Sequence, residues 1–468
     1  MKFGKLDPTA TVPLYRQIVD RFRTAIAGGV LKPGDRIPSA RALTQELGLA
    51  RGTVDAAYGL LAAEGYIQAR GQAGTIVTPD LKQRAATANA PARSTGRNAP
   101  ASFRPDSILP FQMGLPALDA FPRKIWARLG ARCVRAMRPS DMAYPPIHGL
   151  PALREEIAAY LQLSRGIDCS ASQVFITAGY RQTMSLIARA LLRTGDGVWT
   201  EDPGFPPTRE LLGRLQMTPV PVPVDRDGLV VEEGVRAAPR ARAAVVTPAH
   251  QSPLCVTLSL SRRHALLDWA ARSDAWIVED DYDGEYRYVS RPLPALKSLD
   301  RDGRVLYAGT FSKVLFPSLR LAYLVVPPAQ VERFEEITQA LAEDSPALVQ
   351  AIVAAFMKEG HFARHVQRMR RLYGERREAT VAGLEAVLGN RVRIDGQPGG
   401  MHLILRLRGK RSDRRIVARL RDAGLFAEAL SDWTATGDDA SALLVNFTNV
   451  DSQATAEMLA RRILAVMA

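Results

Sequence analysis

The sequence predicts an α/β protein in two parts: a small N-terminal domain of helices with a β-hairpin, and a larger domain built on a mainly parallel sheet with a smaller C-terminal α/β subdomain. The first observation is length, because 468 residues exceed what one ordinary core accommodates. The second is a polar stretch at residues 81–107 with almost no large apolar residue. The third is the alternation of apolar runs with helical stretches over residues 108–468, which is typical of βαβ architectures.

The composition favours a cytoplasmic protein that contacts a polyanion. The formal net charge is +14 and the pI is about 9.9, although a solvated basic surface is the alternative explanation. The three cysteines are far apart and form no CxxC pair, so we expect a reducing compartment, no disulfide framework and no metal site. The polar N-terminus lacks the apolar core of a signal peptide, and no apolar run is long enough to span a membrane.

Residues 1–80 predict three helices and two short strands. The first helix begins at Pro13, carries an apolar residue at every fourth position from Leu14 to Ile26, and ends at Gly28. Ser39 is a suitable N-cap for a second helix that ends at Gly48. A third helix follows over about residues 50–64, and strands at 66–70 and 75–78 flank a glycine-rich turn. This order is that of a winged helix-turn-helix, in which the third helix enters the major groove.

This segment resembles the GntR family of bacterial regulators. The matching motifs are Pro38-Ser39-Ala40-Arg41, Leu47-Gly48-Leu49-Ala50-Arg51-Gly52-Thr53-Val54, Glu64-Gly65-Tyr66 and Gly71-Gln72-Ala73-Gly74-Thr75. The resemblance implies that DNA is contacted by Arg41, Arg51, Thr53, Arg70 and Gly71. An arginine at the head of a recognition helix can pair with guanine, and a glycine at a wing tip lets the backbone approach a groove. Asp55 departs from relatives that are basic there, so their base preference does not carry over.

Residues 81–107 predict a flexible basic linker. Such a composition cannot bury enough apolar surface to offset the entropy of ordering the chain. The stretch has one acid, Asp106, against five basic residues: Lys82, Arg84, Arg93, Arg97 and Arg104. We expect either a tether that contacts DNA phosphates or a solvated spacer.

The larger domain, residues 108–468, contains six apolar runs that predict strands: 174–177, 197–200, 243–247, 275–278, 305–308 and 321–326. Polar or glycine residues follow the first five of these runs. In open α/β sheets, ligands bind at the carboxyl ends of the strands. We therefore expect the residues that follow these strands to form one site.

Those residues are suited to hold pyridoxal 5'-phosphate (PLP). Asp280 can pair with a protonated pyridine nitrogen, and Tyr282 can reach the ring oxygen. Lys313 can form a Schiff base with the aldehyde. Phosphate ligands would come from Thr310, Ser312, Arg320 and the start of a helix at Gly179, and Phe205 can stack on the ring. Each residue taken alone is more often structural, and only the ordered series indicates a cofactor site.

The series resembles the fold-type I aminotransferases and, over nearly the whole chain, the MocR subfamily of GntR regulators, which fuse both modules. Further matching stretches are 149–154, 164–167, 247–251 and 309–313. The resemblance implies that Lys313 carries PLP, with Asp280, Tyr282 and Arg320 on its nitrogen, ring oxygen and phosphate. It places His250 or Gln251 beside the ring, and Tyr180 and Arg181 follow Gly179 where relatives have small or amide residues. It also implies head-to-tail homodimers, in which the DNA-binding domain of one chain rests on the large domain of the other and Tyr144 faces the partner's cofactor.

One departure bears on activity. Transaminases place an arginine near Leu444 to clamp a substrate carboxylate, yet no arginine lies between Arg421 and Arg461. Another source would be needed, and the sequence leaves Arg123, Arg181 and Arg209 open. We therefore predict a PLP-dependent transcriptional regulator that binds operator DNA and senses PLP or a small amine or amino-acid-like ligand through an aldimine at Lys313. The alternatives are a catalytically active aminotransferase with an attached DNA-binding domain, and an aminotransferase fold with a purely structural role; we expect at most weak transamination.

Overall fold

A computed structural model describes residues 6–8, 10, 12–71, 74–79, 108–288, 294–341, 345–395, 399–409, 411–437 and 440–467. The chain divides into two compact units, residues 1–104 and 105–468. The predicted linker at 81–107, with its basic residues, lies outside the described residues. Among the helices of the described ranges, none is long and apolar enough to cross a membrane.

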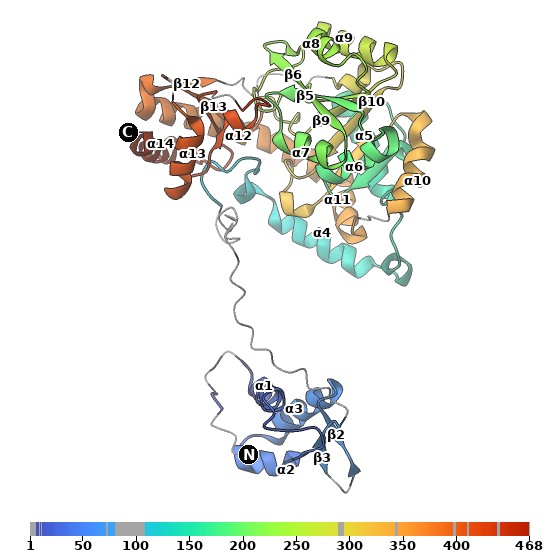
Figure 1. Ribbon diagram of the computed structural model, residues 1–468, viewed down its shortest axis with the longest axis vertical. Coiled ribbons are helices and arrows are strands. Elements are labelled where there is room, and N and C mark those ends of the chain that lie inside the picture. The colour runs from blue at the N-terminus through green and yellow to red at the C-terminus, as the bar shows by residue number, and fades with distance from the viewer. Residues whose placement is uncertain are drawn as a thin grey trace. The chain divides into compact units, whose positions relative to one another are not determined.

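The first unit is a three-helix domain with a small sheet (Figure 1). Its helices are α1 (Leu14–Ala27), α2 (Ala40–Leu47) and α3 (Arg51–Ala63). Its antiparallel sheet has the order β1-β3-β2, from β1 (Arg36–Ile37), β2 (Ile67–Ala69) and β3 (Thr75–Val77). The predicted helices and hairpin are present, and β1 is an additional strand that was too short to give a period of its own.

Local sequence explains the bounds of α2. The Ser39 hydroxyl accepts a 3.2 Å hydrogen bond from the amide of Ala42, which caps the first turn. Gly48 ends the helix in the left-handed conformation, with φ of +65°. Ile18, Phe22, Leu43 and Val54 are fully buried in the shared core, so the apolar stripe of α1 packs on the other two helices as the spacing predicts.

An eight-stranded sheet with the order β4-β11-β10-β9-β8-β5-β6-β7 forms the centre of the second unit. Its strands are β4 (Val174–Thr177), β5 (Gly197–Asp202), β6 (Thr218–Asp225), β7 (Gly228–Leu229), β8 (Ala243–Val246), β9 (Trp276–Asp281), β10 (Val305–Thr310) and β11 (Ala322–Val325). Strands β10, β9, β8, β5 and β6 are parallel neighbours, whereas β11 runs antiparallel to both β10 and β4. The carboxyl ends of β4, β5, β8, β9 and β10 therefore lie along one edge of the sheet.

Helices cover both faces of this sheet. Val278 and Leu306 pack in one cluster with α6 and α10, whereas their neighbours Ile277 and Val305 pack in another with α9, as alternation along a strand requires. The helices are α4 (Arg123–Ala136), α5 (Pro151–Arg165), α6 (Tyr180–Leu191), α7 (Pro206–Arg214), α8 (Val231–Ala237), α9 (Leu260–Arg272), α10 (Val331–Leu341) and α11 (Ala347–Lys358).

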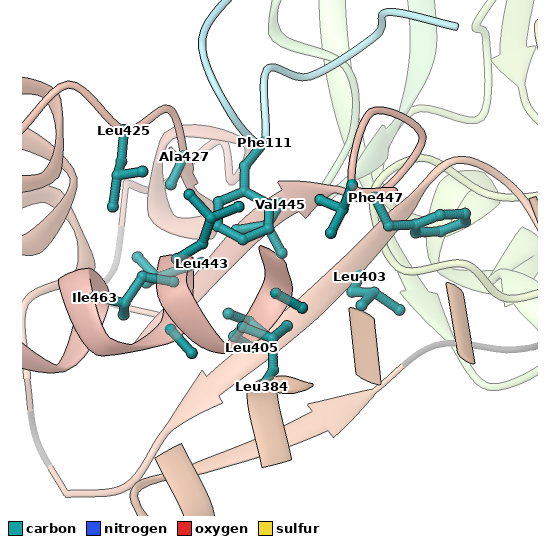
Figure 2. Close-up of a cluster of buried hydrophobic side chains, with 14 of the residues drawn as sticks. Phe111, Leu384, Leu403, Leu405, Leu425, Ala427, Leu443, Val445, Phe447 and Ile463 are labelled. Carbon is teal, nitrogen blue, oxygen red and sulfur yellow. The ribbon is translucent and has the colours of Figure 1, made fainter. Parts of the chain in front are cut away.

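A smaller C-terminal subdomain completes the unit. Its antiparallel sheet has the order β12-β13-β15-β14, from β12 (Val392–Asp395), β13 (His402–Leu407), β14 (Glu428–Ala429) and β15 (Ala442–Asn446). The helices α12 (His361–Leu388), α13 (Asp413–Asp422) and α14 (Gln453–Met467) cover it. Figure 2 shows that Phe111, from the segment before α4, points into this apolar cluster toward Val445. The segment at 108–116 is thereby fixed against the subdomain.

The main difference from the predicted strands is β6, which pairs in parallel with β5 although it contains Pro219, Pro221 and Pro223. Beyond it β7 pairs only with Val224 and Asp225, so most of β6 lies at the edge of the sheet, where proline is tolerated. Because proline argues against a strand, the alternating prolines kept the apolar pattern of residues 218–225 from being predicted as one.

Candidate functional site

The predicted site residues meet in a cavity of about 390 Å³ at the carboxyl edge of the large sheet. Asp280 comes from β9, Thr310 and Lys313 from β10 and the turn after it, and Gly179 from the turn after β4. The opposite wall comes from the 108–116 segment and from the C-terminal subdomain. The cavity is therefore enclosed by parts of the chain that are far apart in sequence.

Lys313 extends into this cavity. Its Nζ donates a 2.8 Å hydrogen bond to the carbonyl oxygen of Gly114. A Cβ at residue 114 would lie 2.5 Å from Nζ, so only glycine permits this approach. Burial lowers the pKa of the Lys313 ammonium, against the opposing effect of Asp283 and Asp280. A lowered pKa favours the neutral amine, which is the nucleophilic form.

The two neighbouring aspartates of β9 have different surroundings. Asp280 lines the cavity, and no described residue donates a hydrogen bond to its carboxylate. Asp281 instead accepts hydrogen bonds of 2.6 Å from Arg165 Nε, 2.5 Å from Tyr307 Oη and 3.0 Å from the amide of Gly284. Burial, reinforced by Asp281, raises the pKa of Asp280 to about 8. A cationic partner in the cavity would favour the ionised form of Asp280.

An anion cradle lies at the start of α6. Gly179 precedes the helix with φ of +128°, and a Cβ there would come 3.0 Å from a guanidinium nitrogen of Arg320. The hydroxyl of Thr310 accepts a 3.1 Å hydrogen bond from the amide of Ser312, and both residues line the cavity. A helix N-terminus, two hydroxyl groups and an arginine together suit a phosphate.

Aromatic side chains form the wall beside Asp280. Phe205 packs edge-on against Tyr180, with ring centroids 5.8 Å apart, and at a tilt against Trp433 at 5.7 Å. The hydroxyl of Tyr180 lies 2.6 Å from that of Thr208, and burial raises the pKa of Tyr180. Phe205 remains 40% exposed and lines the cavity, so it can still cover a planar ligand.

Tyr282 also lines the cavity, whereas His250 and Gln251 are not among the lining residues. His250 Nδ1 lies 3.1 Å from the hydroxyl of Tyr282 and 3.0 Å from Asp283 Oδ2. The Gln251 amide donates hydrogen bonds to Glu201 at 3.2 Å and to the carbonyl oxygen of Pro203 at 2.9 Å. His250 therefore supports Tyr282, and Gln251 organises a loop; their place beside a bound ring stays a prediction.

None of the three arginines considered for carboxylate binding lines the cavity. Arg123 is exposed on α4, and Arg181 is exposed in the first turn of α6. Arg209 donates hydrogen bonds to the carbonyl oxygens of Gly204, Trp433 and Thr434 at 2.8–3.3 Å. Among the described residues that line the cavity, Lys313 and Arg320 are the only lysine and arginine.

A buried thiol adjoins the cavity. Cys255 Sγ lies 3.4 Å from His402 Nε2, and His402 lines the cavity. Burial acts against a thiolate, but the coulombic effects of His402 and His250 lower the pKa of Cys255 to about 6. The lowered pKa of the Cys255 thiol could not be predicted from the sequence, because residues 250, 255 and 402 come together only in the folded chain.

Sequence reasoning missed several further cavity residues. Gly114, Ser252, His402, Glu428 and Trp433 line it without a local motif of their own. The Trp433 indole donates a 3.0 Å hydrogen bond to Glu428. Gly114 could have been predicted as a cavity residue only if the path of the 108–116 segment along the carboxyl edge of the sheet had been known.

The predicted DNA contacts lie on the first unit. Arg41 and Arg51 are exposed in the first turns of α2 and α3, and Thr53 is half-buried on α3. Arg51 Nε lies 3.4 Å from Asp55, in a largely exposed pair. Arg70 and Gly71 form the exposed tip of the β2–β3 hairpin, where Gly71 has φ of +53°. The structure thus leaves these side chains accessible to a duplex.

Comparison with known proteins assigns both units. Residues 14–77 match the model of the bacterial regulatory proteins of the gntR family, and residues 116–463 match aminotransferase class I and II. The chain is 38% identical to the probable rhizopine catabolism regulatory protein MocR of Rhizobium meliloti, over 91% of this chain and 88% of that protein. The chain belongs to the MocR subfamily of GntR regulators.

Other members and structures agree with this assignment. The MocR-subfamily chain is 35% identical to the HTH-type pyridoxine biosynthesis transcriptional regulator PdxR of Corynebacterium glutamicum, over 93% of this chain and 92% of that one. An archaeal alanine:glyoxylate aminotransferase superposes with a TM-score of 0.71 at 26% identity, covering 77% of this chain and 90% of that one. The α-aminoadipate aminotransferase LysN of Thermus thermophilus, complexed with N-(5'-phosphopyridoxyl)-L-leucine, superposes with a TM-score of 0.68 at 26% identity, covering 77% and 93%.

The cofactor of this MocR-subfamily regulator is PLP. Two observations of the structure fit that group. The carboxylate of Asp280 faces the cavity without a described hydrogen-bond donor, as a partner for a pyridinium requires. The glycine at position 179 leaves room for Arg320 beside a helix N-terminus, as a phosphate cradle requires.

Proposed function

We propose that this chain is a PLP-dependent DNA-binding transcriptional regulator that senses PLP itself, or a small amine or amino-acid-like ligand, in the cavity around Lys313. One observation supports this most directly: a GntR unit and a cavity with Asp280, Lys313 and Arg320 in place are carried on one chain. When bound, PLP supplies an aldehyde carbon that primary amines attack.

The residues of the chain divide the work of holding this cofactor. Lys313 provides the amine that attaches it, and its contact with Gly114 orients that amine. Asp280 holds the proton on the ring nitrogen, and Tyr282 binds the ring oxygen with His250 behind it. The phosphate is bound or enclosed by residues from three segments of the chain: Gly179, Tyr180, Arg320, Ser312 and Thr310. Arg181 is exposed at the same helix start and reaches the phosphate only if its side chain turns inward.

On DNA, Arg51 and Thr53 read bases in the major groove and Arg41 anchors the backbone, while Arg70 and Gly71 approach a neighbouring groove. This assignment rests on their exposure and on their positions at the start of α3 and at the hairpin tip. Ligand binding would shift the population between arrangements of two such domains and so change their match to two half-sites.

The two domains would come from a head-to-tail homodimer. Tyr144 is 96% exposed and the nearby Met142 is 69% exposed, which is unusual for large apolar side chains unless a partner covers them. We infer that this surface faces the second subunit and that Tyr144 reaches the partner's cavity.

The proposal is tested by the absorbance of the purified protein and by borohydride reduction. We expect a visible band of lysine-bound PLP and a reduced adduct on Lys313. Lys313→Ala should lose the adduct, whereas Lys358→Ala, at an exposed position on α11, should keep it. An adduct that persists in Lys313→Ala would refute the assignment.

The alternative, a working aminotransferase, is tested by turnover with common amino donors and keto acids. We expect negligible turnover, because Leu444 is fully buried where an arginine would bind the substrate carboxylate. Rapid multiple turnover with any physiological pair would make the enzyme the primary function.

A further inference from the structure

We propose that the effector is a diamine: a primary amine with a second cationic amino group and no carboxylate, whose second ammonium is bound by Glu428. This inference rests on the proposed function, because it assumes that the first amino group meets PLP at Lys313. It names the chemical class of the ligand, which the fold and the family leave open.

The charges of the cavity support a cationic ligand. Asp280, Lys313 and Arg320 are occupied by the ring nitrogen, the aldehyde and the phosphate of the cofactor. Once these are assigned, Glu428 is the remaining carboxylate among the described lining residues, and no lysine or arginine remains there to receive an acid group. A carboxylate on the ligand would therefore have no lysine or arginine partner and would share the cavity with Glu428. His402 also lines the cavity, but its Nε2 already lies 3.4 Å from Cys255 Sγ and 2.9 Å from the carbonyl oxygen of Pro253.

Glu428 is held in place with one oxygen available. Its Oε2 accepts the 3.0 Å hydrogen bond from the indole of Trp433, and no described residue donates to Oε1. Burial raises the pKa of Glu428, with the hydrogen bond from Trp433 acting in the opposite direction. An ammonium beside Oε1 would supply a hydrogen bond to that oxygen and would add to the favourable charge effects of His402 and Lys313 on this carboxylate.

The register of the small sheet places the Glu428 carboxylate beside the position where transaminases have an arginine for the substrate carboxylate. Glu428 of β14 lies directly opposite Leu444 of β15. Leu444 is fully buried in an apolar cluster with Trp433 and therefore offers no charge to a ligand. The polar character at this point of the cavity wall is consequently acidic rather than basic.

The cavity wall also includes apolar side chains that suit an alkyl chain. Met113, Met401, Phe205 and Trp433 all line the cavity. Thioether and aromatic groups pack well on methylene groups, and the two aromatic faces add a favourable contact for a cation. The methylene groups of a short aliphatic diamine would thus have apolar surface to pack on in this cavity.

The experiment titrates the PLP-loaded, full-length protein with three ligands of matched length: putrescine, γ-aminobutyrate and n-butylamine. They end in an ammonium, a carboxylate and a methyl group. The shift of the cofactor absorbance gives apparent Kd values, and calorimetry checks them. We expect putrescine to bind about tenfold to a hundredfold more tightly than either other ligand, as a charged hydrogen bond predicts.

Glu428→Gln keeps the shape and an acceptor for Trp433 but removes the charge, so we expect it to lose this preference. Glu336→Gln, at an exposed position on α10, is the matched control and should behave as wild type. The cofactor band of each variant shows that the cavity is intact.

Tighter binding of γ-aminobutyrate, or a putrescine preference that survives in Glu428→Gln, would overturn the inference. If the cofactor is bound but no amine shifts its band, the diamine inference also fails, while a regulator that senses PLP itself stands. If wild type holds no PLP, the proposed function itself fails.

Discussion

Arg165 donates a 2.6 Å hydrogen bond from Nε to Asp281, and both side chains are almost wholly buried. A terminal nitrogen of the same guanidinium, Nη2, lies 3.0 Å from a carboxylate oxygen of Glu285. This buried ion pair fixes β9 to α5, so that the residue before Asp281, Asp280, is presented to the cavity. The two adjacent carboxylates thus have separate roles, one in the fold and one toward the cofactor.

We therefore predict opposite phenotypes for two substitutions. Asp280→Asn should fold normally and lose PLP on dialysis, because the amide cannot hold the ring nitrogen protonated. Asp281→Asn should destabilise the protein by up to about 3–5 kcal/mol, since it leaves buried Arg165 with Glu285 as its remaining charged partner. Denaturant unfolding and cofactor absorbance separate the two effects. A stable Asp281→Asn variant that has lost PLP would reverse the assignment.

The pH dependence of the cofactor-free protein tests the surroundings of Asp280 further. The pKa of this carboxyl is about 8 in the folded chain, against an ordinary value of 3.8. The folded state therefore holds one proton more than the unfolded state between these values, and this group makes the free energy of unfolding fall as pH rises from about 4 to about 8. Asp280→Asn should weaken that decline, as measured by urea unfolding at several pH values. A decline as steep as that of wild type would show that Asp280 does not titrate in this range.

Gly179→Ala should weaken PLP binding roughly tenfold, because the new Cβ would crowd Arg320 and the backbone has φ of +128°. The control is Gly213→Ala on α7, where a Cβ meets nothing within 4 Å. That variant should keep wild-type PLP affinity and gain up to about 1 kcal/mol of stability. Equal PLP affinity in both variants, measured by fluorescence titration, would argue against a phosphate cradle at Gly179.

Arg51→Ala should weaken operator binding by about 1–3 kcal/mol and relax base preference at one position in each half-site. The exposed pair with Asp55 is weak enough for Arg51 to leave it for a base. Neutralising the basic residues of 81–107 should instead weaken operator and scrambled duplexes about equally and flatten the salt dependence. The measurement is a salt titration on both duplexes. An unchanged operator-to-scrambled ratio for Arg51→Ala would make Arg51 a phosphate contact.

Much of the fold and the chemical core of the site could be predicted from the sequence, because both follow from local patterns. The strand that ends beside Asp280 and the strand that precedes Lys313 are continuous apolar runs followed by polar residues, and α2 of the first unit has a clear cap at Ser39 and ends at Gly48. Most of the residues that were missed lie on segments that reach the cavity from elsewhere: Gly114 before α4, and His402, Glu428 and Trp433 in the C-terminal subdomain. No local period marks them, because their position depends on how the two subdomains pack.

If occupancy of the Lys313 cavity controls DNA binding, the affinity of the protein for its operator must differ with and without ligand. The operator can be selected from random duplexes with the full-length protein. We expect PLP, or PLP with a bound amine, to change the affinity of wild type by about fivefold or more, whereas Lys313→Ala should bind the same duplex with one affinity under every condition. A wild-type affinity that does not respond to PLP or to any amine, or an equal response in Lys313→Ala, would show that this cavity does not control DNA binding.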